Sequence, residues 1–162
     1  MKKLLLLLFL PLSFFCCKTT TYTLDELPDT RVYFGEGGGF AGTLTEYLLL
    51  PNGQLFVKPQ GTSTFVELNG LARKESKLLF KQLDSLRLHK YDFNKPGNLY
   101  KYLRQTDAEI DHRVTWGMPD VPVRPDVQRM YKSLKAAVEG KKRKDGEEED
   151  EPKKEEEKPY GW

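Results

Sequence analysis

The chain has 162 residues, of which 26 are basic and 24 acidic, and its net charge of +2 provides no basic footprint for a nucleic acid. Only the first stretch of the chain is continuously apolar, which excludes a multi-pass membrane protein. The two ends differ from the middle, because residues 141–162 hold seven Lys or Arg and nine Asp or Glu, whereas residues 4–15 carry no charge. We therefore predict a single domain over residues 30–140, large enough to bury its own core.

The N-terminus has the features of an export signal. Two lysines precede an apolar run that suits a secretory signal and is short for a spanning helix. The run ends at Cys16-Cys17, and this junction resembles a bacterial lipoprotein signal, in which a small residue precedes the Cys that is lipidated. Cys17 follows the small Cys16, whereas Cys16 follows the bulky Phe15. We predict a signal peptide over 1–16 and palmitate-bearing lipid at Cys17, with Cys16 as the alternative site. An ordinary signal peptide and a spanning helix remain open.

The first half of the domain has strand-like patterns. Residues 17–29 are rich in Thr and lack periodicity, so we predict a tether between lipid and domain. Asn52-Gly53 lies between two apolar runs, and this pair is a strong hairpin signal because both residues tolerate the positive φ of a type I′ turn. We expect strands at residues 31–34, 43–50, 55–57 and 65–68.

Helical periodicity appears in the second half. Leu79, Leu83 and Leu86 are spaced i, i+4 and i+7, which predicts an amphipathic helix over 74–88. Strand patterns return at 99–105 and 110–116, the second ending in Trp116, which we expect to fill the core.

The last element is a second helix. Pro125 suits its first turn, Asp126 favours its positive dipole end, and Gly140 stops it. The charged tail over 141–162 has almost no apolar residues, so we expect it to be disordered. Because strands joined by hairpins pair antiparallel, we predict an α+β fold in which two amphipathic helices pack on one face of the sheet.

A glycine cluster separates the first two strands. Residues 37–42 satisfy the G-x-G-x-x-G pattern, but a strand follows where dinucleotide binding requires a helix. The cluster is therefore a glycine-rich β–β connection, either a plain hairpin or a recognition tip that exposes Phe40. Residues 89–98 form a second turn-rich segment, either a connector or a binding edge beside the glycine loop. The candidate partner-binding residues are Gly37, Gly38, Gly39, Phe40, Ala41, Gly42, Asn94, Pro96, Gly97 and Asn98.

Groups that could carry out chemistry are scarce. Both cysteines lie at the signal junction, so the domain has no thiol. His89 and His112 lack a second histidine at metal-binding spacing, and no serine has the context of a nucleophile. We predict no catalytic residues, no metal and no cofactor.

The segment Gly38-Gly39-Phe40-Ala41-Gly42, followed by a Leu-rich helix, a late hairpin and a final helix, resembles emfourin. That family comprises small protein inhibitors of thermolysin-like metalloproteases such as protealysin. The layout, including residues 91–98 and Trp116-Gly117, also resembles small uncharacterised lipoproteins of Gram-negative bacteria.

This resemblance implies a lipid-anchored binding module of the cell envelope that inhibits a metalloprotease. It would be held to the periplasmic side of a membrane or to the cell surface by its N-terminal lipid, with a metalloprotease or another envelope protein as partner and no nucleic acid. The alternatives are a structural or interaction lipoprotein, or a small-ligand binder between sheet and helices, which would need a sizeable cavity.

Overall fold

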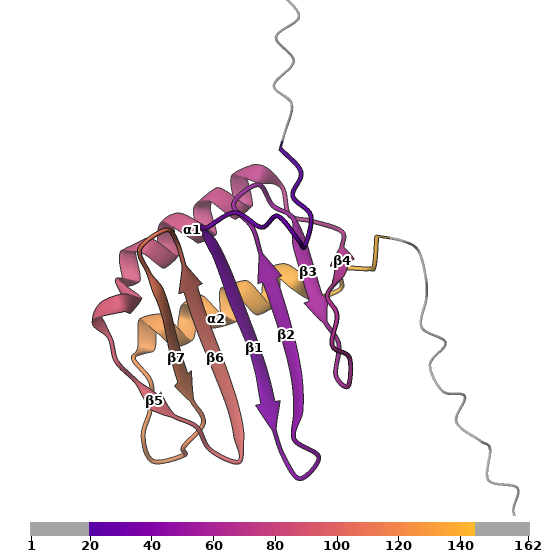
Figure 1. Cartoon of the computed structure of the whole chain (residues 1–162). Helices are drawn as coiled ribbons and strands as arrows, with labels where there is room; N and C mark the ends of the chain where they lie inside the picture. The colour runs from indigo at the N-terminus through magenta and orange to yellow at the C-terminus, as the bar shows by residue number, and fades with distance from the viewer. Residues whose placement is uncertain (1–19, 145–162) are drawn as a thin grey trace, which may run out of the picture.

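A seven-stranded sheet forms the centre of the molecule (Figure 1). The computed structural model describes residues 20–144, so the predicted signal peptide, both candidate lipidation cysteines and residues 145–162 lie outside it. The strand order is β4-β3-β2-β1-β6-β7-β5, and every neighbouring pair is antiparallel except β5 and β7. The strands are β1 (Arg31–Gly38), β2 (Thr43–Leu49), β3 (Leu55–Lys58), β4 (Val66–Leu68), β5 (Asn94–Lys95), β6 (Leu99–Thr106) and β7 (Asp111–Trp116).

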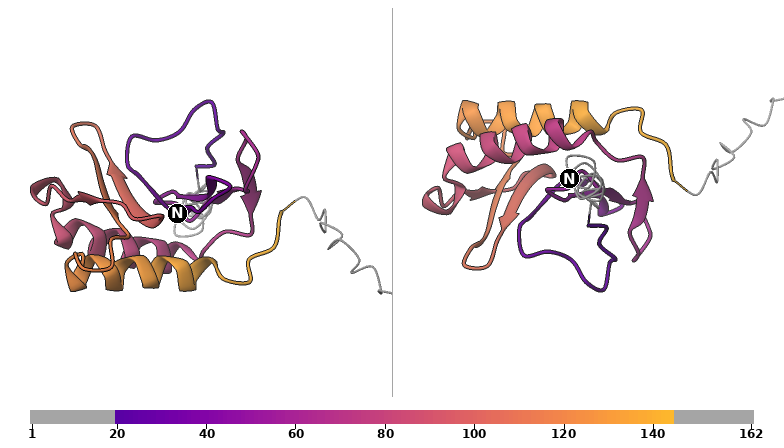
Figure 2. Two further views of the ribbon diagram at one scale, coloured as in Figure 1. Left: turned by 90° about the horizontal axis from the view of Figure 1, so that it is seen from below. Right: turned by 90° about the horizontal axis from the view of Figure 1, so that it is seen from above.

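Two helices, α1 (Arg73–Leu86) and α2 (Pro125–Val138), cover one face of this sheet, which we call the inner face. Figure 2 shows both helices on that side, with the segment before β1 on the opposite, outer face. The predicted α+β class is confirmed. Within residues 20–144, neither helix is long and apolar enough to cross a membrane.

The core lies between the inner face and the helices. Alternate residues of the central strands point into it, as the period of a strand requires. Trp116 is buried there and meets Tyr131 of α2 edge to face, with ring centroids 5.2 Å apart, so its predicted place in the core is confirmed. Side chains at most 1% exposed in this layer include Val32, Phe34, Leu49, Leu55, Leu83, Leu88, Leu103, Val114, Val127 and Leu134.

The first helix ends earlier than its apolar spacing predicts. α1 stops at Leu86, because Arg87 adopts the left-handed region with φ 49°. A short 3-10 helix, η2 (Leu88–Lys90), then brings Leu88 into the core, where it is fully buried. The apolar pattern thus continues past the end of the helix, because apolar residues mark buried positions whether or not these positions are helical.

The prediction that residues 17–29 form a tether is wrong for residues 20–29, which pack on the domain. Thr20 and Tyr22 are fixed to the turn formed by residues 50–54: Asn52 Nδ2 donates to the Thr20 carbonyl at 2.8 Å, and the Tyr22 N–H donates to Gln54 Oε1 at 2.7 Å. Gln54 Nε2 also donates to the Tyr22 carbonyl at 3.0 Å. Tyr22 and Leu27 pack with a small apolar cluster on the outer face. Without helical or strand periodicity, the sequence pattern gives no signal for such side-chain anchoring.

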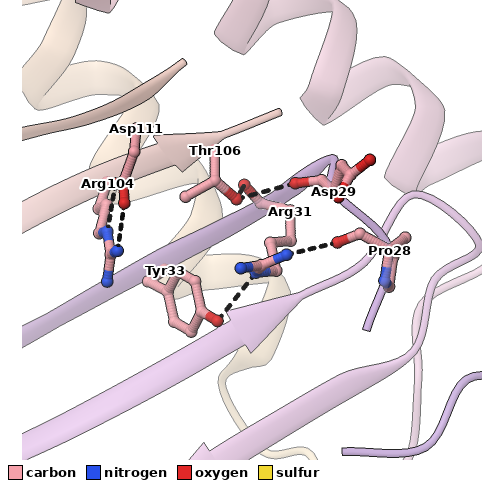
Figure 3. A network of polar contacts seen from close by, with 7 residues as sticks. All are labelled: Pro28, Asp29, Arg31, Tyr33, Arg104, Thr106 and Asp111. Carbon is pink, nitrogen blue, oxygen red and sulfur yellow. Dashed lines mark hydrogen bonds and ion pairs between the residues drawn. The ribbon is translucent and has the colours of Figure 1, made fainter. Parts of the chain in front are cut away.

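A polar network fixes the entry into β1 (Figure 3). Arg31 donates from Nη1 to the Pro28 carbonyl at 2.7 Å, and Thr106 Oγ1 donates to the Asp29 carbonyl at 2.9 Å. On the neighbouring strands, Arg104 and Asp111 form a two-bond ion pair with distances of 2.6 Å. Residues 20–29 therefore belong to the folded domain.

The start of the predicted disordered tail is also part of the fold. The Asn69 N–H donates to the Lys142 carbonyl at 2.8 Å, and the Lys144 N–H donates to the Glu67 carbonyl at 3.0 Å. Residues 141–144 thereby satisfy backbone groups at the edge of the sheet beside β4, which would otherwise be an unpaired edge. The rest of the predicted tail lies outside the described residues.

Candidate binding edge at the glycine hairpin

The glycine cluster is largely strand. β1 continues through Gly35 and Gly37 to Gly38, four residues beyond the predicted end of this strand. These glycines make room for the backbone of β2 and for large side chains on β6. A Cβ on Gly35 would lie 2.2 Å from the Thr45 carbonyl oxygen and 3.1 Å from a ring carbon of Tyr102. One on Gly37 would lie 2.6 Å from the Thr43 carbonyl oxygen and 2.9 Å from Tyr100 Oη. Glycine is disfavoured in strands, which is why the sequence pattern ends the strand too soon.

Only residues 39–42 remain as a tip between β1 and β2. The Gly42 N–H donates to the Gly39 carbonyl at 3.0 Å, and Thr43 Oγ1 donates to the Gly38 carbonyl at 3.2 Å. Gly38, Gly39 and Gly42 have φ values of 105°, 77° and 59°, a region that other residues rarely adopt. The glycines thus form a short, hydrogen-bonded turn rather than a long open loop.

The second predicted segment lies directly beside this tip. The Gly39 N–H donates to the Asn98 carbonyl at 2.8 Å, and a Cβ on Gly38 would lie 2.0 Å from the same oxygen. A Cβ on Gly97 would lie 2.4 Å from the carbonyl oxygen of Gly117, the residue after β7. The structure therefore brings residues 97 and 98 together with the glycine tip.

Asn94 lies elsewhere. It pairs with Thr115 in the short parallel strand β5, and both β7 and β6 separate it from β1. Asn94 therefore belongs to the flank of the sheet and is not brought together with the glycine tip. Pro96 follows β5 and connects this flank to Gly97.

Exposed apolar side chains gather at this end of the sheet. Phe40 is fully exposed, Leu99 is 68% exposed and Met118 is 47% exposed. A Cβ on Gly39 would lie 3.6 Å from Leu99 Cδ2, so the tip and the start of β6 are in contact range. We call Phe40, Leu99 and Met118 the tip patch. The sequence predicts exposure only for Phe40. Leu99, which follows a turn, and Met118, which follows a glycine, are exposed without having been predicted.

A groove begins at the tip patch and continues along α2. A cavity of about 680 Å³ is lined by Leu99, Met118, Trp116 and Val123, and a second cavity of about 820 Å³ continues past Tyr47 and Lys132. The two share Glu36, Thr45, Gln60, Lys101, Trp116 and Gln128, so they form one groove between the lower inner face and α2.

The groove wall is ion-paired. Lys135 Nζ donates to Glu36 Oε1 at 2.8 Å, and this hydrogen bond holds the pKa of the Glu36 carboxyl below its ordinary value. Tyr131 Oη donates to the Gly35 carbonyl at 3.2 Å, and burial raises the pKa of its phenol. Lys101 Nζ lies 5.8 Å from the Tyr131 ring centroid. These groups connect α2 to the sheet and give the groove a mixed polar lining.

Neither histidine joins the binding edge. His112 Nε2 lies 3.1 Å from the Tyr91 carbonyl, so this histidine connects β7 to the segment after η2, and His89 is exposed. In the part of the chain from residue 20 to 144, no three His, Cys, Asp or Glu side chains come together to hold a metal.

Because the phenol of Tyr102 is buried, we expect the folded domain to lose stability at alkaline pH. Tyr102 is 1% exposed on the outer face, donates to the Glu46 carboxylate and lies under Arg113, whose guanidinium carbon is 3.9 Å from the ring centroid. Burial, followed by the hydrogen bond to Glu46, raises its pKa well above the ordinary 10.0. A raised phenol pKa stabilises the folded state below pH 10, and this stability is lost as the pH rises further.

We expect the free energy of unfolding to fall above pH 10, with Tyr102 and Tyr131 each contributing up to about 1.4 kcal/mol per pH unit. Urea titrations of the protein between neutral pH and pH 11 measure this slope. Tyr102→Phe removes one titrating group and should give a shallower slope than wild type. Equal slopes in the two proteins would show that Tyr102 does not control alkaline stability.

These observations define a small α+β domain with an apolar hairpin tip above a mixed polar groove. Among known proteins, no family model matches the chain, and no curated protein matches it in sequence.

Proposed function

We propose that this protein is a lipid-anchored binding module of the cell envelope that contacts another protein through the tip patch. The observation that carries the proposal is the fully exposed Phe40 on a turn that is hydrogen-bonded to Asn98, the residue before β6. An exposed aromatic side chain beside further apolar groups is typical of a binding hot spot. A pinned turn loses little conformational entropy when it binds, which favours affinity.

The partner we propose is a thermolysin-like metalloprotease, with the protein acting as a non-catalytic inhibitor. The resemblance of residues 38–42 to emfourin supports this choice. The narrow tip between β1 and β2 has a suitable form for entering a cleft, and Leu99 and Met118 would contact the rim. An envelope lipoprotein with a different protein partner would use the same patch.

The point where the chain enters the domain also supports a role for the tip patch in binding a partner. In Figure 1 the chain enters the domain at one end of the sheet, and the β1–β2 tip lies at the opposite end. A lipid at Cys17 would therefore hold the domain with the tip patch directed away from the membrane, where a partner can reach it.

A titration of the lipidated protein in detergent against a thermolysin-like metalloprotease tests this function. We expect inhibition by wild type and a loss of about 30-fold or more in affinity for Phe40→Ala, as for a hot-spot residue. Leu78→Ala is the matched control, because Leu78 is also exposed but lies on α1. Equal inhibition by wild type and Phe40→Ala would contradict the tip as contact surface. No inhibition at micromolar protein would contradict the protease as partner.

The groove supports a second candidate function, the binding of a small molecule. Its two cavities are each within the range of about 300–1,000 Å³ that is usual for ligand sites. Trp116 and Tyr47 would supply apolar contacts, and Lys101 would favour an anionic group. A thermal-shift screen that finds a stabilising anion, with the shift lost in Lys101→Ala, would favour this function.

A further inference from the structure

The exposed face of α1 is basic and lies at the end of the domain where the chain enters. Arg73, Lys74, Lys77 and Lys81 are all exposed, and the exposed Leu78 lies among them. Within residues 20–144 none of these four cations pairs with a carboxylate. Glu75 is the one acidic side chain between Arg73 and Lys81.

This helix is fixed beside the first described residues of the chain. Ser76 Oγ donates to the Leu50 carbonyl at 2.9 Å, and the Leu71 N–H donates to the Gly53 carbonyl at 2.9 Å. The same turn of residues 50–54 holds Thr20 and Tyr22 through Asn52 and Gln54. Figures 1 and 2 agree that α1 lies at the end of the sheet where the chain enters, and α2 is farther from that end.

The spacing between lipid and domain is short. Thr20 is the third residue after Cys17, and an extended chain spans at most about 3.6 Å per residue. A lipid at Cys17 would thus hold Thr20 within about 11 Å of the bilayer surface. The Debye length at physiological salt is about 8 Å, so an anionic membrane attracts mainly the cations that lie at the end of the domain nearest to it.

We propose that the exposed face of α1 binds an anionic phospholipid surface and thereby sets the orientation of the domain on the membrane. The proposal rests on the lipid anchor of the proposed function. Each Lys or Arg close to an anionic surface strengthens its attraction about fivefold, and Leu78 adds an apolar contact at the level of the headgroups. The lipid supplies one membrane signal and α1 the second, the combination that gives stable anchoring. This orientation keeps the tip patch away from the bilayer.

The test uses the lipidated chain in vesicles of phosphatidylcholine alone, or of phosphatidylcholine and phosphatidylglycerol in equal amounts. Because every cysteine of the chain lies at the signal junction, Leu78→Cys introduces a single site for a fluorophore in the domain. Ser133→Cys on the exposed side of α2 is the matched position. A quencher on the lipid headgroup should quench the probe at residue 78 severalfold more than the probe at 133, and only in the anionic vesicles.

Charge reversal then distinguishes binding through the cations of α1 from attraction by the overall charge of the protein. Lys77→Glu with Lys81→Glu should reduce quenching at residue 78 to its value in phosphatidylcholine. Arg129→Glu with Lys132→Glu makes the same charge change on exposed positions of α2 and should leave that quenching unchanged.

Equal quenching at residues 78 and 133, or quenching that survives reversal on α1, would overturn the proposed orientation. A chain that sediments with neither kind of vesicle would overturn the lipid anchor and this orientation with it. The protease titration is carried out in detergent, so its failure would concern the tip patch alone.

Discussion

Replacing Gly38 with Ala is expected to destabilise the domain by about 2–4 kcal/mol and to weaken binding through the tip patch. Gly38 has φ 105°, where a side chain strains the backbone by about 1–3 kcal/mol. Its new Cβ would also lie 2.0 Å from the Asn98 carbonyl oxygen, so the strand and the turn must separate. Separation breaks the hydrogen bond from Gly39 to Asn98, which adds about 0.5–1.5 kcal/mol.

Gly42→Ala is the matched control for this change. Gly42 also has a positive φ, of 59°, but a Cβ there would meet no atom within 4 Å. We expect only the backbone cost of about 1–2 kcal/mol. Urea unfolding of both variants measures the difference. Equal destabilisation by the two substitutions would mean that the close packing of β1 on Asn98 contributes nothing to stability.

Replacing each of two phenylalanines on the same hairpin with Ala should change the free energy of unfolding by very different amounts. Phe34 is fully buried and stacks on Tyr47 with ring centroids 5.3 Å apart, so Phe34→Ala should cost about 3–5 kcal/mol. Phe40 at the tip is fully exposed, so Phe40→Ala should leave the free energy of unfolding within about 0.5 kcal/mol of wild type.

Denaturant unfolding of the two variants, followed by the protease titration for Phe40→Ala, separates folding from binding. A large loss of stability in Phe40→Ala would show that this side chain packs against the domain and is not displayed for a partner. A Phe34→Ala variant as stable as wild type would contradict the position of this residue in the core.

The strands and helices could be predicted wherever periodicity reflects burial. Leu79 and Leu83 lie on the buried face of α1, and Asn52-Gly53 forms the turn between β2 and β3. The antiparallel sheet with both helices on one face follows from these elements, because hairpins pair neighbouring strands and each apolar face must be covered.

The wrong predictions share one physical cause: tertiary contacts override the local structural preference of the sequence. The sequence pattern ends the strand before Gly35 and Gly37, yet both are strand residues because β2 and β6 pair with them on either side. A Cβ at these positions would collide with the carbonyl oxygens of Thr45 and Thr43 on β2, so the close packing requires glycine. The segment with Tyr22 has no period, and it is held by side-chain hydrogen bonds to a turn 32 residues away. No local pattern encodes such a pairing.

Part of the candidate binding edge could be predicted from the sequence. Glycines around Phe40 predict either a plain hairpin or a recognition tip that exposes this ring, and residues 89–98 predict either a connector or a binding edge beside it. Leu99 and Met118 join the tip patch only because β1, β6 and β7 end at the same edge of the sheet. The groove along α2 likewise depends on where the helix lies on the sheet, which the sequence pattern does not specify.

The proposed function depends on a glycine tip that is held by Asn98, directly before β6, and presents Phe40 on a preorganised turn. Amide hydrogen exchange of Gly39, measured residue by residue in the intact protein, tests whether this turn is held in place. Because this N–H donates to the Asn98 carbonyl at 2.8 Å, we predict protection comparable to that of the β6 amides and its loss in Gly38→Ala. Exchange of the Gly39 amide at the rate of an unstructured peptide would contradict the preorganised turn.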